Sequence, residues 1–309
     1  MTVCNILITG SNSGCGFDCA RQLALRGGVQ KIILGCRNID KANVARANLE
    51  KITGKTIFEI LIIDVSSLES VRKAVQELKE PIDALIMNAG GFGNRETMLE
   101  SGVINVVALN ILGHVLLFDL LIEQKKLVSG GTAIYVSSEV ARGMPGIQRY
   151  EFKDGGSVSE FKSLCDGSGC GGDSWSAEQY YGCTKMVATL WILGMARKHP
   201  PNIRVMAVSP GATDGTNVNR DFPKWKQLLF DNVLFPIMTF LGKIHSLETG
   251  SKRYVDALYD EETYTTGVFY ASQTAWPTGN MTDQIMHAPF FGDEEYQNNA
   301  SVAIHSFIK

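Results

Sequence analysis

Short apolar runs alternate with stretches of helical periodicity through the first two thirds of the chain, a pattern typical of βαβ units. The apolar runs predict strands at 3–9, 31–36, 58–63, 84–87, 133–137, 204–208 and 267–270. The periodic stretches predict helices at 16–26, 40–51, 68–78, 100–126, 178–198 and 247–259. Strands that alternate with helices in this way predict an α/β fold built on a parallel sheet.

Segment 139–179 interrupts the alternation. It is rich in Gly, Ser and Asp and separates a predicted strand from the next helix by about 40 residues, longer than most loops of a compact domain. Two interpretations stay open: a tolerated surface insertion, or a flap or interface blocker beside a functional site. Because α/β proteins of about 250 to 300 residues often form one unit, we expect a single domain over 1–309 with 139–179 as an insertion.

Composition narrows the class of protein. The chain is 45% hydrophobic and 20% charged with a net charge of −3, which excludes disorder and a polybasic surface, so no nucleic-acid partner is expected. Seven cysteines lack paired C-x2-C spacing and five histidines form no cluster, so no metal site is expected. An odd number of scattered cysteines suits a reducing compartment.

The N-terminus and the apolar stretches bear on location. The opening MTVCNILITG has no charged leader region or cleavage site, which predicts a cytoplasmic protein. The longest apolar stretch, 106–122, contains Asn110, His114 and Asp119, and the next, 228–241, is interrupted by polar residues and a proline. Neither is expected to span a membrane.

A glycine-rich loop, TGSNSGCG at 9–16, follows the first predicted strand and opens the first helix. Its glycines would let the backbone approach a pyrophosphate, whose charge the helix N-terminus stabilises. Such a loop alone equally fits a tight turn, but its place at the first βα junction favours a dinucleotide site. The candidate residues are Gly10, Ser11, Asn12, Ser13, Gly14, Cys15 and Gly16.

The end of the second strand selects the cofactor. It reads Gly35-Cys36-Arg37-Asn38, without the acid that binds the ribose of NAD. Arg37 gains a charge-assisted contact only from a 2′-phosphate, so we predict NADP(H), with Arg37 and Asn38 at the site. The alternative is a solvated cation at the start of a helix. The residues expected to wall the adenine and support the sheet edge are Asp64, Val65, Asn88, Ala89 and Gly90.

Tyr181 and Lys185 lie one turn apart on one helix face. The lysine would lower the pKa of the tyrosine, which could then exchange protons near neutrality. Ser138 follows the fifth strand, where its hydroxyl can bind a substrate carbonyl. Asn110 lies inside an apolar helix, where a buried amide needs a partner. It marks either a local helix bulge or a water that passes protons to Lys185.

These motifs, in this order over nearly the whole chain, resemble the short-chain dehydrogenase/reductase family. The resemblance implies a doubly wound parallel sheet of the Rossmann type with Tyr181 as catalytic acid/base. Lys185 would bind the nicotinamide ribose and tune Tyr181, Ser138 would polarise the carbonyl, and Asn110 would hold a water relay. The cofactor loop implied after the sixth strand contains Pro210 and Gly211, with Thr213 and Thr216 both candidates.

Within the family the layout resembles the retinol dehydrogenase, protochlorophyllide reductase and carbonyl reductase branches. The expected reaction is NADPH-dependent hydride transfer to or from the carbonyl or alcohol of a lipophilic substrate. A light-dependent, protochlorophyllide-type C=C reductase is an alternative, although those enzymes carry Thr at Ser138 and Cys at Ala212. A non-catalytic NADP-binding regulator is a second alternative, which the intact Ser138, Tyr181 and Lys185 oppose.

The resemblance also implies a substrate-binding lid at 212–245. Its apolar side chains suit a lipophilic ketone, aldehyde or alcohol, and shallow membrane contact through them lacks the basic flanks it would need. We expect a monomer, as in the carbonyl reductases, because the insertion would cover the helices through which family members pair. The apolar lid residues are Trp225, Leu229, Phe230, Phe235, Met238 and Phe240.

Overall fold

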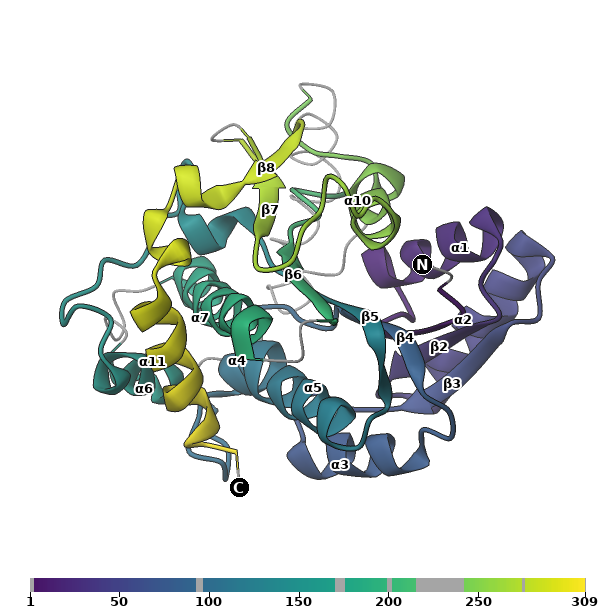
Figure 1. Ribbon diagram of the computed structural model, residues 1–309, viewed down its shortest axis with the longest axis horizontal. Helices are drawn as coiled ribbons and strands as arrows, with labels where there is room; N and C mark the ends of the chain where they lie inside the picture. Colours follow the sequence, from purple (N-terminus) through teal and green to yellow (C-terminus); the bar gives the residue numbers. More distant parts are fainter. Residues whose placement is uncertain are drawn as a thin grey trace, which may run out of the picture.

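The computed structural model describes residues 3–92, 97–169, 176–198, 202–214, 242–273 and 276–308. They form one sheet in the order β3-β2-β1-β4-β5-β6-β7-β8, with helices on both faces (Figure 1). Strands β1 to β7 pair in parallel and β8 pairs antiparallel to β7. The predicted doubly wound parallel sheet is confirmed. The strands are β1 Asn5–Thr9, β2 Lys31–Cys36, β3 Phe58–Ile62, β4 Ile82–Met87, β5 Leu127–Val136, β6 Arg204–Val208, β7 Phe269–Ser272 and β8 Met281–Asp283.

The helices fall into two layers. One layer contains α1 Gly14–Arg26, α2 Ile39–Thr53 and α10 Leu247–Tyr259, and the other contains α3 Leu68–Glu77, α5 Gly113–Glu123, α7 Ala177–Lys198 and α11 Glu294–His305. The short α4 Asn105–Val107 precedes a π-helical turn, Ala108–Leu112, and α6 Val158–Asp166 lies beside α11. Further 3-10 turns span Glu139–Arg142, Gln284–Met286 and Pro289–Gly292.

Alternation along the strands explains the two layers, because successive side chains of a strand point to opposite faces. Leu7 of β1 and Tyr135 of β5 belong to the core beneath α3, α5, α7 and α11. Ile8 and Val136, one position further along, belong to the core beneath α1, α2 and α10. The sheet is therefore buried on both faces, which accounts for its nearly continuous apolar runs.

Most predicted elements recur within a few residues, and the departures have local causes. The helix expected from residue 100 begins at Asn105, because Gly102 has a left-handed φ of 81° and Met98 pairs with Ile104 in a turn. The pattern did not predict β8, α6 or α11. β8 has three partly exposed residues, and the other two are amphipathic helices inside the insertion and after the last βα unit.

Helix α7 is enclosed by its own chain. Residues 182–195 are all buried, and α11 packs along α7 and reaches α5 (Figure 1). His305 of α11 bonds Asp119 of α5 at 2.9 Å, and Gln297 contacts both Arg197 and Gly194 of α7. By length and apolarity the helical stretch Asn105–Glu123 could cross a membrane, yet 78% of its apolar window is buried inside the protein.

Candidate active site

A cavity of about 940 Å³ opens at the carboxyl ends of the parallel strands, where open α/β sheets bind ligands. Most residues predicted from the sequence line it: Gly10, Asn12, Ser13, Gly14, Cys15, Arg37, Asn38, Asp64, Val65, Asn88, Ala89, Gly90, Ser138, Tyr181, Lys185, Pro210, Gly211 and Thr213. Ser11, Gly16 and Asn110 lie behind its wall, and Ser11 and Asn110 are fully buried. Thr216 and the predicted apolar lid residues lie outside the described residues.

At the end of β1 the cavity is shaped for phosphate. The amide of Asn88 donates to the carbonyls of Thr9 and Gly10 at 2.9 and 3.3 Å, which fixes the glycine-rich loop. A Cβ at Gly16 would lie 2.5 Å from that amide, so a side chain is excluded there. Ser13, the N-cap of α1, makes no side-chain capping bond, and the N–H groups of the first turn are left for an anion.

A buried hydroxyl also faces this end. Tyr254 of α10 lines the cavity beside Cys15 and is fully buried. Its hydroxyl bonds no nitrogen or oxygen atom within the described ranges. Its partner is the Cys15 thiol, which is a weak one, and a phosphate oxygen of a dinucleotide would fit as a stronger partner. The residues present therefore suit the cofactor, and sequence patterns gave no signal for Tyr254.

Two cations lie further along the cavity, after the end of the neighbouring strand β2. Arg37 and Lys41 both line the cavity and are exposed. Asn38 has a structural task, because its Oδ1 accepts from the N–H of Lys41 at 2.9 Å and caps α2. Asp64 turns its carboxylate to Ser66, whose N–H and hydroxyl donate at 2.9 and 2.6 Å. Lys41 was not predicted as a site residue. Its position in the first turn of the helix after the second strand could have indicated it.

The candidate catalytic side chains gather at the β5 side of the cavity, with the glycine-rich loop between them and Arg37. Lys185 is 2% exposed, and its Nζ donates to the carbonyl of Val136 at 2.8 Å and to the hydroxyl of Tyr135 at 3.2 Å. The same Nζ lies 5.6 Å from the centre of the Tyr181 ring. The neighbouring Ser137 bonds the hydroxyl of Thr189 at 2.6 Å and so ties β5 to α7.

The pKa values of Lys185 and Tyr181 differ from those expected from the sequence. Burial lowers the pKa of Lys185 to about 7, so its positive charge is weakened at neutral pH. Burial, and to a lesser extent the charge of Glu139, raises the pKa of Tyr181. The prediction that Lys185 lowers the pKa of Tyr181 is therefore wrong for these contacts, since burial weakens the cation and penalises the phenolate.

Asn110 occupies the π-helical turn that interrupts the α4–α5 helix, one of the two arrangements anticipated for it. Its side-chain amide donates to the carbonyls of Gly91 and Val106, both at 2.8 Å, and thereby fixes the 90–91 turn. A Cβ at Gly90 would lie 2.7 Å from Asn110 Oδ1. The Asn110 carbonyl accepts from the hydroxyl of Tyr135 at 3.0 Å, and that hydroxyl links it to Lys185.

A buried ionic cluster directly behind Ser138 was also not predicted. Glu139 accepts from the N–H and hydroxyl of Ser272 at 3.1 and 2.9 Å and from the hydroxyl of Ser209. Arg253 of α10 lies 3.4 Å from the Glu139 carboxylate and donates to Ser209 O at 3.1 Å. Its other nitrogen reaches His245 at 2.9 Å. The cluster joins the end of β5 to the loop that contains Pro210 and to β7.

The insertion meets the site at one turn and packs elsewhere. Met144 and Ile147, which pair across that turn, line the cavity. Further on, Phe152 packs against Tyr296 of α11 with ring centres 4.6 Å apart. One turn of the segment thus lies beside the site, and the part around Phe152 packs against α11. The apolar lining near Tyr181 comprises Phe92, Leu109, Val140, Met144, Ile147 and Ile244.

Comparisons with known proteins agree with this geometry. The family model described as short chain dehydrogenase matches residues 4–151, which include Ser138 but end before Tyr181. A WW domain-containing oxidoreductase of Gallus gallus is 35% identical over 140 residues, 44% of this chain and 33% of that protein. Retinol dehydrogenase 13 of Homo sapiens is 34% identical over 136 residues, 43% of this chain and 40% of that protein. The matches thus span well under half of these relatives.

Solved structures share the fold over a longer stretch. An uncharacterized protein from Mycobacterium paratuberculosis has a TM-score of 0.69 at 20% identity, covering 98% of this chain and 92% of that chain. L-sorbose reductase from Gluconobacter frateurii, solved with NADPH and L-sorbose, has a TM-score of 0.62 at 21% identity, covering 86% of this chain and 94% of that one. Family match, relatives and fold agree with the resemblance inferred from the sequence. The resemblance to the short-chain dehydrogenase/reductase family is thus shown over residues 4–151, just under half of the chain.

Proposed function

We propose that this protein is an NADP(H)-dependent oxidoreductase that acts on the carbonyl or alcohol of a lipophilic substrate. The observation that carries the proposal is the single cavity that joins Ser138, Tyr181 and Lys185 to a phosphate cradle and to Arg37 and Lys41. NADP(H) fits because both cations lie where the adenosine ribose of a bound dinucleotide would end. The NADPH named with L-sorbose reductase gives the choice further support.

The side chains of the chain itself would bind, orient and exchange the proton. Ser138 would donate a hydrogen bond to the substrate oxygen, and Tyr181 would give that oxygen a proton in reduction or take one in oxidation. Lys185, fixed by Val136 and Tyr135, would supply positive charge beside Tyr181. The bound nicotinamide supplies or accepts the hydride.

A lipophilic substrate follows from the wall opposite this group. Phe92 lies 4.9 Å from Tyr181 between ring centres, and Met144 and Ile147 of the insertion extend the apolar surface. Apolar walls with few convergent polar groups are typical of sites for small apolar ligands. The proposal includes a monomeric, cytoplasmic protein that uses neither nucleic acid nor a metal.

The test is NADPH oxidation with a panel of lipophilic aldehydes, ketones and quinones, run with wild type and Tyr181→Phe. Turnover by wild type is expected to disappear in the variant, while NADPH binding, followed by fluorescence, stays within a few fold because the phosphates are held elsewhere. Substantial turnover by Tyr181→Phe would overturn the role of Tyr181. Tight NADPH binding without turnover of any substrate would instead indicate a regulator.

A further inference from the structure

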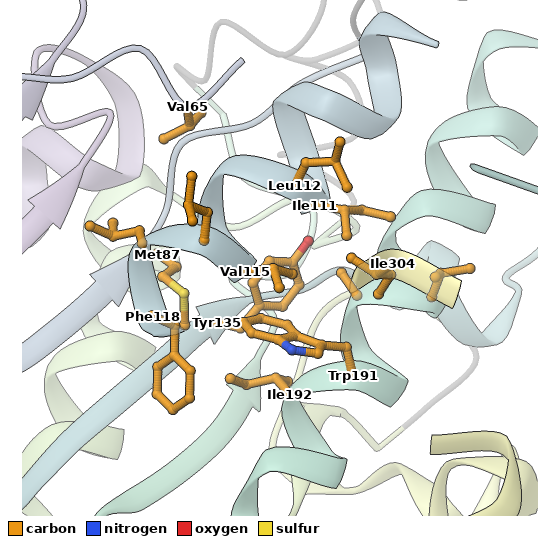
Figure 2. Close-up of a cluster of buried hydrophobic side chains, with 14 of the residues drawn as sticks. Val65, Met87, Ile111, Leu112, Val115, Phe118, Tyr135, Trp191, Ile192 and Ile304 are labelled. Carbon is orange, nitrogen blue, oxygen red and sulfur yellow. The ribbon is translucent and has the colours of Figure 1, made fainter. Parts of the chain in front are cut away.

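Tyr135 places a hydroxyl in an otherwise apolar layer. It lies on β5, three residues before Ser138. The residue is completely buried, with 0% of its surface accessible. Its ring packs edge-on against Trp191 of α7, with ring centres 6.5 Å apart, near Val115 and Ile111 (Figure 2). Because a buried hydroxyl without partners is costly, the partners of this one define what it does.

Those partners give the hydroxyl a direction. In its ammonium form Lys185 Nζ has only hydrogens to offer, so it donates to the Tyr135 oxygen at 3.2 Å. The Tyr135 hydroxyl in turn donates to the carbonyl of Asn110 at 3.0 Å. Burial keeps the pKa of Tyr135 well above its usual value, so the hydroxyl retains this proton over the working pH range.

The Asn110 carbonyl has a second partner in His114. His114 Nδ1 lies 3.4 Å from the Asn110 carbonyl, and its Nε2 lies 3.2 Å from the hydroxyl of Thr9. Burial lowers the pKa of His114 to about 3, so the ring is neutral and carries one hydrogen. A carbonyl cannot donate, so that hydrogen is on Nδ1, and both lone pairs of Asn110 O are occupied.

We propose that Tyr135 is a positioning residue that holds Lys185 in place through its hydroxyl, which is anchored on the carbonyl of Asn110. The bonds from Tyr135 and from His114 converge on that carbonyl, so the hydroxyl has one orientation and presents its oxygen to the ammonium. Lys185 then has two fixed acceptors, Val136 O and Tyr135 Oη, and keeps its third hydrogen for the cavity. This inference rests on the proposed function for its catalytic meaning and on the contacts alone for the positioning.

The ionisation of Lys185 reports the contact directly. The titratable groups around it are Tyr181 on its own helix, Tyr135 on β5 and His114 on α5. Removing the Tyr135 oxygen deprives the ammonium form of an acceptor and leaves the neutral form little changed. Tyr135→Phe is therefore expected to lower the pKa of Lys185 by about one unit, the size expected for one hydrogen bond to a charged group.

The first experiment measures that pKa in the cofactor-free protein by NMR of lysine labelled with 13C at Cε, the Lys185 signal being identified by its loss in Lys185→Met. Tyr150→Phe is the matched control, since it removes a tyrosine hydroxyl bond to Glu160 in the insertion. A Lys185 pKa that falls in Tyr135→Phe and stays constant in Tyr150→Phe supports the proposal. An equal Lys185 pKa in wild type and folded Tyr135→Phe overturns it.

A second experiment follows alcohol oxidation with NADP⁺ as a function of pH. Weaker positive charge on Lys185 stabilises the phenolate of Tyr181 less, so the limb on which activity rises with pH is expected to move to higher pH by a similar amount. Should no substrate turn over, the proposed function fails while the pKa measurement still decides the positioning. If Tyr135→Phe is active and its activity rises over the same pH range as that of wild type, the result counts against the positioning role of Tyr135.

A third measurement needs no variant, in case Tyr135→Phe does not fold. The Tyr135 hydroxyl proton of the wild type is expected to give a resolved proton NMR signal that exchanges slowly with solvent, because it is buried between two fixed partners. Absence of any protected tyrosine hydroxyl signal would contradict the arrangement.

Discussion

Glu139 and Arg253 form a buried ion pair at 3.4 Å although 114 residues separate them along the chain. The side chains are 2% and 7% exposed. The pair lies behind Ser138 and links the end of β5, the 209–211 turn and β7 through Ser209 and Ser272. Its position makes it a support of the site that the strand pattern did not reveal.

Removing one member of this pair is expected to be costly, because the other charge is left buried and unpaired. Glu139→Ala should lower the free energy of unfolding by about 3 to 5 kcal/mol, and Glu139→Gln by less because it keeps an acceptor. Urea unfolding measures both. Lys252→Ala, which breaks an exposed pair with Asp256 on the same helix, is the control and should cost under about 1 kcal/mol. Equal losses in Glu139→Ala and Lys252→Ala would contradict the assignment.

Arg37 and Lys41 are expected to set the preference for NADPH. Each charge-assisted contact to the 2′-phosphate contributes about 1.5 to 3 kcal/mol, so Arg37→Ala should weaken NADPH binding roughly ten- to a hundredfold. NADH, which lacks that phosphate, should bind the variant as it binds wild type. Titration of both cofactors decides the matter: wild type that binds NADH as tightly as NADPH removes the argument. Lys41→Ala should show the same selectivity with a smaller loss.

Stability of the cofactor-free protein should rise with pH above neutrality because of Lys185. Its folded-state pKa of about 7 lies below the ordinary lysine value of 10.5. Between these values the unfolded chain binds a proton that the folded chain does not, so the free energy of unfolding increases by up to about 1.4 kcal/mol per pH unit. Urea unfolding of wild type and Lys185→Met at pH 7, 8 and 9 isolates this effect as a difference. Parallel curves for the two proteins would show that Lys185 is ionised normally.

The protein is expected to be a monomer of 33.8 kDa, since α11 covers the α7 surface within one chain. Ala300 of α11 is fully buried, whereas Val302 on the opposite face is 54% exposed. Ala300→Arg should displace α11, expose apolar surface of α7 and promote association in light scattering. Val302→Arg should leave the mass unchanged. A wild-type tetramer would show this prediction to be wrong.

The sequence predicted the strands, the carboxyl edge and the cavity lining because these follow from local periodicity and from residues adjacent to strand ends. Contacts that depend on distant segments could not be read in this way. Tyr135 is an ordinary strand residue until the π-helical turn before α5 brings the Asn110 carbonyl to its hydroxyl. Arg253 is one cation of an amphipathic helix until it meets Ser272 of β7 and Glu139. The pKa of Tyr181 depends on burial, which only the packed structure shows.

The docking of α11 also bears on how the properties of the protein depend on its concentration. A segment of the same chain packs against α7 and reaches α5, so the cavity of the proposed monomer would form without a second molecule. Activity per mole is then expected to stay constant on dilution, and the melting temperature to be independent of protein concentration, whereas a protein stabilised by association loses both as it is diluted.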